Sequence, residues 1–301
     1  MTQPTIALAG AVGDLGTRIA RALIDRGAAV RALVRPDVSA EERSRLEALG
    51  LELAEADPHD RDALAATLAG AACVVSALNG LREVIVDRQT VLLDAAVQAG
   101  VPRFIPSDYS LDFTKTTPGG NCNLDLRREF MARADRAPLR VTSVLNGAFM
   151  DMLGAEMPVI QPGIRRVLFW ADAGQPLDFT TKDDVAAFTA AAALDDAAPR
   201  VLRVAGEAVS ARDLAAAMSD VTGRRYRTLY AGSAGLLGVM IGAAKRVAPQ
   251  AQETFPAWQG MQYMRDMFSG QGKLEPLDNE RYPDVRWTPV RAQLAARFGR
   301  A

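Results

Sequence analysis

Three glycines follow a short apolar segment at the start of this chain and constrain its fold more than any other feature. Gly10, Gly13 and Gly16 come directly after residues 5–9, and residues 14–26 carry apolar side chains at helical spacing. Glycines at these positions permit a tight turn, a close backbone approach to a pyrophosphate and close packing of a helix on a strand. The spacing predicts a strand, a phosphate-binding loop and a helix, the alternative being an ordinary helix-start turn. The candidate dinucleotide-binding residues of this loop are Gly10, Val12, Gly13, Asp14, Leu15 and Gly16.

Apolar strands and amphipathic helices continue to alternate after this loop. Strands that alternate with helices at this spacing form right-handed βαβ units and a parallel sheet covered on both faces. The fold class is therefore α/β, with an NAD(P)-binding Rossmann fold, which is a doubly wound parallel sheet. The expected strands are 5–9, 29–34, 51–54, 72–76, 103–106 and 139–145, and the longer expected helices are 14–26, 60–68, 84–99 and 124–134.

The second half of the chain loses this regular alternation, and helices dominate it from Gly206 onward. We expect a Rossmann domain over residues 1–154, to which residues of about 180–205 return. A smaller, mostly helical substrate-binding lobe is expected over residues 155–301. Strands in this half are expected at 166–170, 177–179 and 200–204, with a helix at 183–194.

Charge and cysteine content exclude several classes of protein. The chain has 35 basic and 36 acidic residues, which gives no electrostatic reason to expect a nucleic acid or a membrane as partner. It has one histidine and two cysteines, Cys73 and Cys122, so no metal site is expected. The N-terminal residues lack the basic region of a signal peptide, and the low cysteine content fits a reducing cytoplasm. A cytoplasmic protein is therefore expected, and a homodimer stays open.

The residue after the second expected strand distinguishes NADP(H) from NAD(H). An acidic residue there would bond the ribose 2′-hydroxyl and repel a 2′-phosphate, whereas this chain has Arg35. A guanidinium group can hold a phosphate through two parallel hydrogen bonds. Arg31 and Arg18 could add positive charge nearby, and the alternative for Arg35 is a solvated strand end. The sequence therefore predicts NADP(H) as the cofactor.

Further candidate residues follow the third and fourth expected strands, where the cofactor lies in this fold. Asp57 would lie beside the adenine, with a helix cap or a turn as the alternative role of its carboxylate. Ser76, Ala77 and Leu78 fit a backbone that passes along the cofactor. His59 is expected in an exposed turn without a chemical role.

These motifs resemble those of the NmrA-like family, an atypical branch of the short-chain dehydrogenases and reductases that includes isoflavone-reductase-like enzymes. The resemblance covers about residues 4–205 and implies an NADP(H)-binding Rossmann domain with a smaller C-terminal lobe. It implies members that are NADPH-dependent reductases or regulatory proteins that sense NADP(H). It also implies that segments after the fifth and sixth strands line the nicotinamide pocket, with Ser107, Asn146 and Phe149 among their residues. The motifs that carry it are the glycine loop, residues 33–35, 103–109, 127–128 and 146–149.

The residue pair that mainstream short-chain dehydrogenases use for proton transfer is absent. Those enzymes use a Tyr-x-x-x-Lys pair, and no lysine of this chain follows a tyrosine at that spacing. Isoflavone-reductase-like enzymes instead carry a lysine on the helix of the arginine pair. Alignment on residues 127–128 puts Asn123 at that position, and asparagine can hydrogen-bond a carbonyl oxygen but cannot donate a proton at useful pH.

Three mechanisms stay open. Hydride could pass to an acceptor such as a quinone, whose reduced oxygen takes its proton from water. Tyr109 or Lys115 could donate the proton. The alternative for Tyr109 is an aromatic side chain packed over the pocket, and the alternative for Lys115 is a solvated charge. Without turnover, cofactor binding could change a conformation that a protein partner recognises.

The sequence as a whole predicts an NADPH-dependent oxidoreductase that reduces a small aromatic, quinone or carbonyl substrate. The alternative is a non-catalytic NADP(H)-sensing regulatory protein that acts through a protein partner. An apolar pocket in the second lobe would suit an aromatic or quinoid ligand. Its candidate lining residues, most of them expected in the core, are Phe149, Met150, Met152, Trp170, Trp258, Met261 and Met264.

Overall fold

The computed structural model describes residues 3–154, 156–247 and 256–299. Through its internal contacts the chain forms two compact units. The division into a cofactor-binding domain that ends at residue 154 and a substrate-binding lobe that begins at residue 155 remains a prediction. Ala155 itself lies outside the described residues. The first unit comprises Met1–Tyr109, Leu126–Val144 and Val185–Leu202, and the second comprises Ser110–Asp125, Leu145–Asp184 and Arg203–Ala301.

The first unit is built on a parallel sheet of six strands in the order β3-β2-β1-β4-β5-β6. This order is that of a Rossmann sheet, in which ligands bind outside the carboxyl ends of the strands. Ala9, the last residue of β1, pairs with Leu33 of β2 and with Ser76 of β4, so these three strands end at one level. The strands are β1 (Thr5–Ala9), β2 (Ala29–Val34), β3 (Glu52–Glu55), β4 (Cys73–Ser76), β5 (Arg103–Ile105) and β6 (Arg140–Val141).

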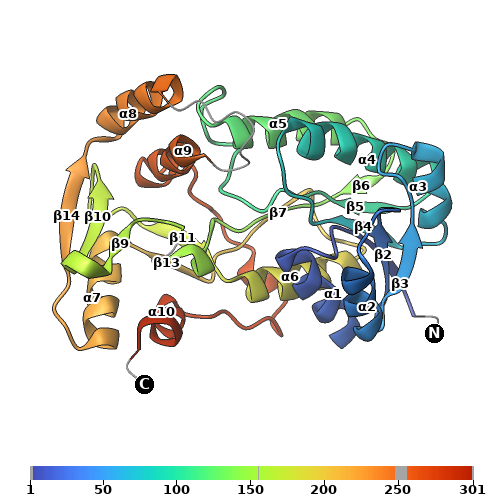
Figure 1. The fold of residues 1–301 in the computed structure, drawn as a ribbon, viewed down its shortest axis with the longest axis horizontal. Helices are drawn as coiled ribbons and strands as arrows, with labels where there is room; N and C mark the ends of the chain where they lie inside the picture. Colours follow the sequence, from blue (N-terminus) through green and yellow to red (C-terminus); the bar gives the residue numbers. More distant parts are fainter. Residues whose placement is uncertain (1–2, 155, 248–255, 300–301) are drawn as a thin grey trace. The chain divides into compact units, whose positions relative to one another are not determined.

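Helices cover both faces of this sheet (Figure 1). On one face lie α1 (Asp14–Asp25), α2 (Ala40–Ala48) and α6 (Lys182–Leu194). On the other face lie α3 (Arg61–Leu68), α4 (Gln89–Gln98) and α5 (Cys122–Ala134). Apolar side chains of the sheet and of these last three helices form a continuous buried core that includes Val74, Phe104, Leu64, Leu93 and Phe130. The predicted doubly wound α/β fold is therefore confirmed.

Two predicted elements of the first unit are interrupted. The strand expected over residues 139–145 breaks at Thr142, because β7 (Ser143–Leu145) leaves the large sheet and pairs with β12 (Val201–Arg203). The helix expected over residues 84–99 begins as a π-helix, η1 (Glu83–Arg88), before α4. Cys73 is fully buried, and burial raises the pKa of its thiol to about 12.

The second unit contains small sheets as well as helices. Strand order is β14-β10-β9 in one three-stranded sheet and β13-β11-β8 in the other. Its strands are β8 (Ala148–Phe149), β9 (Ile160–Gln161), β10 (Arg166–Trp170), β11 (Leu177–Thr180), β13 (Glu207–Val209) and β14 (Arg227–Gly232). Its helices are α7 (Ala211–Thr222), α8 (Ala234–Val247), α9 (Ala257–Phe268) and α10 (Val290–Phe298), with short 3-10 turns η2 (Met150–Met152), η3 (Pro162–Ile164) and η4 (Asn279–Arg281).

Among the described residues, no helix is both long and apolar enough to cross a bilayer. The same residues contain no group of three or more histidine, cysteine or acidic side chains placed to bind a metal ion.

Candidate cofactor site and active site

Two close backbone contacts shape the glycine loop between β1 and α1. Gly10 has a φ of +86°, and a Cβ atom on it would lie 2.7 Å from the carbonyl oxygen of Ala77. A Cβ atom on Gly16 would lie 2.0 Å from the carbonyl oxygen of Gly10, so α1 packs on the loop at a distance that only glycine permits. A Cβ atom on Gly13 would meet nothing closer than 3.4 Å. Gly10 and Gly16 are therefore required by the fold, whereas Gly13 is not.

The N-terminus of α1 is built to receive an anion. Gly13 is the N-cap and supplies no side-chain hydrogen bond to the first N–H groups of the helix. These groups form the positive end of the helix dipole. Thr17 Oγ1 stabilises the loop by donating a hydrogen bond to the carbonyl oxygen of Ala11 at 2.9 Å. Val12 is one of the few exposed large apolar residues, with 36% of its surface accessible.

Two arginines flank the loop on the side of β2 and α2. Arg35 follows β2 directly, and 59% of its side chain is exposed. Arg45 of α2 contacts the loop itself, since its Nη2 donates to the carbonyl oxygen of Val12 at 2.5 Å. Hydrogen bonds with Ser39 lower the pKa of Glu42, and the charges of Arg45 and Arg35 lower it further, so both arginines lie near that carboxylate. Arg45 was not predicted from the sequence, because helical spacing alone does not show which loop a side chain reaches.

The other two arginines expected near the cofactor have structural partners. Arg31 Nε donates to Glu52 at 2.8 Å, and its Nη1 donates to the carbonyl oxygen of Thr67 at 2.9 Å. Arg31 therefore stabilises the C-terminal end of α3, and the expectation that it adds charge to the cofactor site was wrong. Arg18 Nε lies 2.8 Å from Asp14 Oδ1, an i,i+4 ion pair on α1.

The loops after β4 and β5 meet beside the glycine loop. Ala77 N–H donates to the last carbonyl oxygen of β1 at 2.9 Å, and Ser107 Oγ donates to the carbonyl oxygen of Leu78 at 2.6 Å. The buried Gln89 of α4 accepts the N–H of Ser107 at 2.9 Å. Ser76 is fully buried, and its hydroxyl has no hydrogen-bond partner among the described residues. Gln89 has no signal in the sequence, because a buried glutamine in a helix resembles a surface one.

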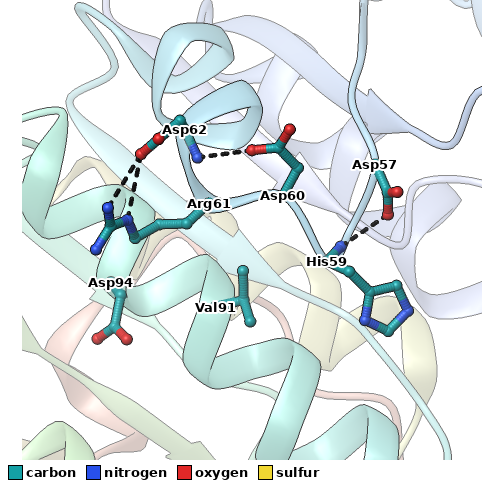
Figure 2. Close-up of a pocket in the computed structure, with 7 residues that line it drawn as sticks. All are labelled: Asp57, His59, Asp60, Arg61, Asp62, Val91 and Asp94. Atoms are coloured by element: carbon teal, nitrogen blue, oxygen red, sulfur yellow. Dashed lines mark hydrogen bonds and ion pairs between the residues drawn. The ribbon is translucent and has the colours of Figure 1, made fainter.

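A surface hollow of about 520 Å³ lies at the start of α3, beyond the end of β3 (Figure 2). Asp57 Oδ1 accepts the N–H of His59 at 2.9 Å, and Asp60 caps α3 by accepting the N–H groups of Asp62 and Ala63, both at 3.0 Å. His59 lies in an exposed turn, as predicted. The carboxylate of Asp57 has the turn role that was one of its two alternatives, and an adenine contact remains a prediction. The lining residues are Asp57, His59, Asp60, Arg61, Asp62, Val91 and Asp94.

A buried carboxylate follows β5. Asp108 Oδ2 accepts a hydrogen bond from Ser143 Oγ at 2.6 Å. Arg200 Nη1 donates to the same hydroxyl at 2.8 Å, and its Nε donates to Asp135 at 2.7 Å. Burial raises the pKa of Asp108, while the Ser143 hydrogen bond and the charges of Arg127 and Arg200 oppose this rise. The network was not predicted, because its members come from distant segments of the chain.

Tyr109, the first candidate proton donor, is buried with 6% of its surface exposed. Burial raises the pKa of its phenol. A phenol with a raised pKa holds its proton more tightly, which makes it a weaker general acid at neutral pH.

Lys115, the second candidate donor, belongs to the second unit and is bound to a neighbouring segment. Its Nζ donates to the carbonyl oxygens of Lys273 and Glu275, at 3.1 and 2.9 Å. It also lies 3.6 Å from a carboxylate oxygen of Asp112. The side chain of Lys115 is 39% exposed, and these contacts hold its loop against residues far along the chain.

Asn123 is the second residue of α5 and is 2% exposed. Polar side chains of α9 hold the loop that precedes it. Gln262 Nε2 donates to the carbonyl oxygen of Gly120 at 2.9 Å, and its Oε1 accepts the first N–H of α5 at 3.3 Å. Asn121 Nδ2 donates to Asp266 at 3.1 Å. Gln262 and Asp266, one helical turn apart and both missed by sequence reasoning, therefore fix the position of Asn123.

Asn146, also in the second unit, is fully buried at the entry to β8. Its backbone is anchored, because its N–H donates to the carbonyl oxygen of Ser110 at 3.0 Å and Thr180 Oγ1 donates to its carbonyl at 2.7 Å. Its side-chain amide has no partner on either atom among the described residues. A buried amide without partners is costly, so it marks a place where a ligand or ordered water completes the hydrogen bonds. Phe149 of β8 follows, with Lys182 Nζ 5.9 Å from its ring centre.

The apolar residues expected around a substrate divide into two groups. Met150, Trp170 and Met264 are buried core residues, and Trp170 packs on Phe268 in a tilted arrangement with ring centres 5.4 Å apart. Gln259 of α9 is also buried, and both its amide atoms lack a partner among the described residues. The half-buried residues are Phe149, Met152, Trp258 and Met261.

The fold and the glycine loop define an α/β protein with a Rossmann sheet. The chain belongs to the NmrA-like family, whose sequence pattern matches residues 2–280. The resemblance drawn from the sequence motifs is therefore confirmed.

Named relatives of this chain include plant reductases. Pinoresinol reductase 1 of Arabidopsis thaliana is 28% identical over 199 residues, which cover 62% of this chain and 63% of that protein. The bifunctional pinoresinol-lariciresinol reductase of Linum usitatissimum is 24% identical over 308 aligned positions, which cover 96% of this chain and 97% of that protein. The match thus spans about 63% of the length of the Arabidopsis relative.

Solved structures share the fold over nearly the whole chain. The structure described as AtPrR2 with NADP+ and (+)pinoresinol has a TM-score of 0.82 and 21% identity, and the match covers 99% of both chains. An NADPH-dependent quinone oxidoreductase of Escherichia coli has a TM-score of 0.74 and 20% identity, with 98% and 100% coverage. At these identities, the comparison establishes the fold.

Proposed function

We propose that this protein is an NADPH-dependent reductase that transfers hydride to a small aromatic, quinone or carbonyl substrate. The shape of the glycine loop is the observation that carries the proposal. Gly10 and Gly16 hold the loop against Ala77 and α1, while Gly13 stands where no protein atom crowds its missing side chain. A loop of this shape, at the N-terminus of a helix and the end of β1, admits a pyrophosphate.

The residues around the loop fit NADP(H). Arg35 and Arg45 place two guanidinium groups near the end of β2, where a 2′-phosphate would need them. The hydroxyl of Ser76 is buried without a partner at the end of β4 and offers a hydrogen bond to a bound cofactor. Two structural neighbours support this assignment. One was solved with NADP+, and the other is a quinone oxidoreductase described as NADPH-dependent.

We assign the cofactor and catalytic roles to the residues predicted from the sequence, and add Arg45. Asn146 has the unpartnered buried amide expected of a residue that meets a ligand. The proposed cofactor-binding residues are Gly10, Val12, Gly13, Asp14, Leu15, Gly16, Arg35, Arg45, Asp57, Ser76, Ala77, Leu78, Ser107, Asn146 and Phe149, and the proposed catalytic residues are Asn123 and, as alternative proton donor, Tyr109.

The groups available to donate a proton determine which class of substrate the protein can reduce. When bound, NADPH would supply a hydride. Asn123 can donate a hydrogen bond to a substrate oxygen but has no proton to transfer. Tyr109 has a raised pKa, and the ammonium of Lys115 is held by two carbonyl oxygens. These residues favour a quinone, because its reduced oxygen is stabilised by the ring and can take a proton from water.

A cofactor titration tests the first half of the proposal. Wild-type protein is expected to bind NADPH at least tenfold more tightly than NADH. Arg35→Ala should lose about 1.5–3 kcal/mol of NADPH binding, or roughly ten- to a hundredfold, and none of its NADH binding. Arg21→Ala, which removes an exposed arginine of α1 beyond its first turn, is the matched control. Equal affinity of the wild type for the two cofactors would contradict the assignment.

A substrate screen tests the second half. NADPH oxidation is measured with quinones, aromatic aldehydes, ketones and enones, and quinones are expected to react fastest. If NADPH binds and no compound is reduced, the regulatory alternative replaces the reductase. We also propose that the protein is cytoplasmic and forms a homodimer. Cell fractionation tests the location, and analytical ultracentrifugation tests the oligomeric state.

A further inference from the structure

Strands β10 and β14 carry a cluster of arginines at the end of their sheet where both strands begin. Arg166 and Arg227, the first residues of the two strands, are partners in the parallel register. Partners in a parallel pair point to the same face of the sheet, so these two side chains start side by side. The carbonyl oxygen of Arg165 accepts the N–H of Arg227 at 3.3 Å. Arg224 and Arg225 lie between α7 and β14. We refer to these five residues as the arginine cluster.

The arginine cluster has no compensating carboxylate in the part of the chain that the structure describes. None of its five residues forms an ion pair with a described residue. Residues 157–171 and 221–252 contain no aspartate or glutamate. Asp220 of α7 is close in sequence, but it lies 3.4 Å from Arg291 and pairs with it. The overall balance of charge therefore does not extend to this end of the sheet.

The fold accounts for only part of this charge. The C-terminal end of α7 is the negative end of its helix dipole and stabilises Arg224 and Arg225. It does not account for Arg166 and Arg227, because like charges at paired positions of a sheet are destabilising. The pair marks a place where an anionic group of another molecule would stabilise the structure.

β14 also has an open side. It is an edge strand, because the strand order of its sheet is β14-β10-β9 (Figure 1). Successive residues of a strand direct their backbone N–H and C=O groups to its two sides in turn. Since the N–H of Arg227 is bonded to Arg165, the backbone groups of Thr228 and Tyr230 point to the open side. Unpaired backbone groups along an edge are a template for an additional strand.

The side chains of β14 suit contact with such a strand on both faces of the sheet. Leu229 lies on the same face as Arg227, and Tyr230 lies on the opposite face. These two residues are 41% and 57% exposed. A strand added to an edge also has side chains on both faces, so its apolar residues can cover both of them.

We propose that β14 accepts an extended, acidic segment of a partner protein as an additional strand of its sheet. The backbone of the segment would pair with Thr228 and Tyr230, and its apolar side chains would pack on Leu229 and Tyr230. Its carboxylates would bind the arginine cluster, where guanidinium groups hold carboxylates through charge-assisted hydrogen bonds. The proposal is independent of the proposed reductase activity.

Charge favours an acidic partner over a second copy of this chain. If two copies of β14 paired antiparallel, the arginine cluster of one copy would face residues 231–236 of the other, which include no acidic residue. If they paired parallel, the two clusters would meet. Neither contact supplies the carboxylates that the cluster lacks, whereas an acidic segment does.

Peptide titration of the full chain tests the charge requirement. Two fluorescent synthetic peptides carry a run of glutamates either before or after alternating valines and threonines, because the added strand can run in either direction. At least one is expected to bind, and high salt should weaken the binding. The same peptide with lysines in place of the glutamates should bind at least about tenfold more weakly. Arg166→Gln and Arg227→Gln should each weaken binding about threefold. Arg21→Gln, at an exposed arginine of α1, should leave it unchanged.

A proline substitution tests the strand pairing. Thr228→Pro removes the N–H that points to the open side and keeps the ladder to β10, so it should lower peptide binding at least about tenfold. Thr228→Ala keeps this N–H and should bind as the wild type does. Circular dichroism and thermal unfolding confirm that both variants fold. A peptide N-methylated at every valine and threonine makes the same test without changing the protein, and should also bind at least about tenfold more weakly.

Three results would overturn the proposal. The first is that neither acidic peptide binds the wild type. The second is equal binding of the methylated and unmethylated peptides, which would show that the arginine cluster attracts charge without strand pairing. The third is a dimer in ultracentrifugation that Thr228→Pro dissociates, which would assign the edge of β14 to self-association.

Discussion

The two compact units present their polar groups in different ways. In the first, the groups at the ends of β1 and β4 are mostly backbone atoms, held by strand pairing and by Gly10 and Gly16. In the second, the groups are buried side chains such as Asn123, Asn146 and Gln262, placed by contacts between distant segments. A site made of backbone changes little when side chains change, whereas a site made of side chains can acquire a new chemistry by one substitution. This contrast fits a chain that keeps its glycine loop and carries Asn123 where the resemblance implies a lysine.

The largest expected effect is on the backbone side of this comparison. Gly16→Ala should lower the free energy of unfolding by about 3 kcal/mol, because the new Cβ atom would overlap the Gly10 carbonyl oxygen, and NADPH binding should be lost. Gly13→Ala should cost about 1 kcal/mol or less in stability but at least tenfold in NADPH affinity. Urea unfolding and cofactor titration measure both. A Gly16→Ala variant of normal stability would contradict the requirement for glycine at this position.

The next effect tests the side-chain region. Gln262→Leu should destabilise the protein by about 2 kcal/mol, because it leaves the Gly120 carbonyl and the first N–H of α5 without partners. It should also lower kcat by moving Asn123, while the Kd for NADPH stays unchanged. Gln262→Glu, which keeps the acceptor, should recover part of kcat. If the Kd for NADPH changes as much as kcat, the assignment of NADPH binding to the first unit and of Asn123 positioning to the second is contradicted.

Arg45 offers a finer test of the cofactor loop. Arg45→Ala should weaken NADPH binding about tenfold, or about 1.4 kcal/mol, through loss of its charge and of its bond to Val12. NADH binding should fall less, because it has no 2′-phosphate. A double variant with Arg35→Ala should show coupling between the two arginines in a titration series. Strict additivity would mean that they act on different groups.

Asp108 predicts a dependence of stability on pH. Burial raises its pKa in the folded state, so the folded protein binds more protons than the unfolded chain above about pH 4. This carboxyl therefore contributes a loss of stability as pH rises through its folded pKa, by at most about 1.4 kcal/mol per pH unit. Urea unfolding across this range should show a shallower decline for Asp108→Asn than for the wild type. Parallel curves would mean that the Asp108 charge is fully compensated.

The smallest expected effect concerns Tyr109. Tyr109→Phe should change kcat with a quinone by less than about threefold, because water supplies the proton in the proposed mechanism. Steady-state kinetics measures this directly. A loss of about a hundredfold would instead assign the proton transfer to Tyr109.

Sequence reasoning predicted the first unit well because its signals are local. The bounds of β1 and β2 match, the helix expected over residues 60–68 forms with Asp60 as its N-cap, and Gly10 and Gly16 have the predicted turn and packing roles. The apolar periodicity and the glycine spacing both depend on a few neighbouring residues, so they can be interpreted without knowing how the rest of the chain folds.

The missed features depend on which distant segments meet. Arg45 reaches back 33 residues to Val12, and Gln262 reaches 142 residues to Gly120. Lys115 contacts carbonyl oxygens about 160 residues away, and neither of its two sequence alternatives, a proton donor or a solvated charge, included these contacts. Hydrophobic periodicity shows that a helix has an inner face, but it does not show which loop that face meets.

A single-turnover experiment tests the central claim most directly. Protein saturated with NADPH is mixed without oxygen with an equal amount of a quinone, and reduced nicotinamide and hydroquinone are followed together. We predict that one hydroquinone forms for each NADPH oxidised, at a rate far above that of the free cofactor. NADPH that stays bound and reduced, with quinones and aromatic carbonyls alike, would contradict the account.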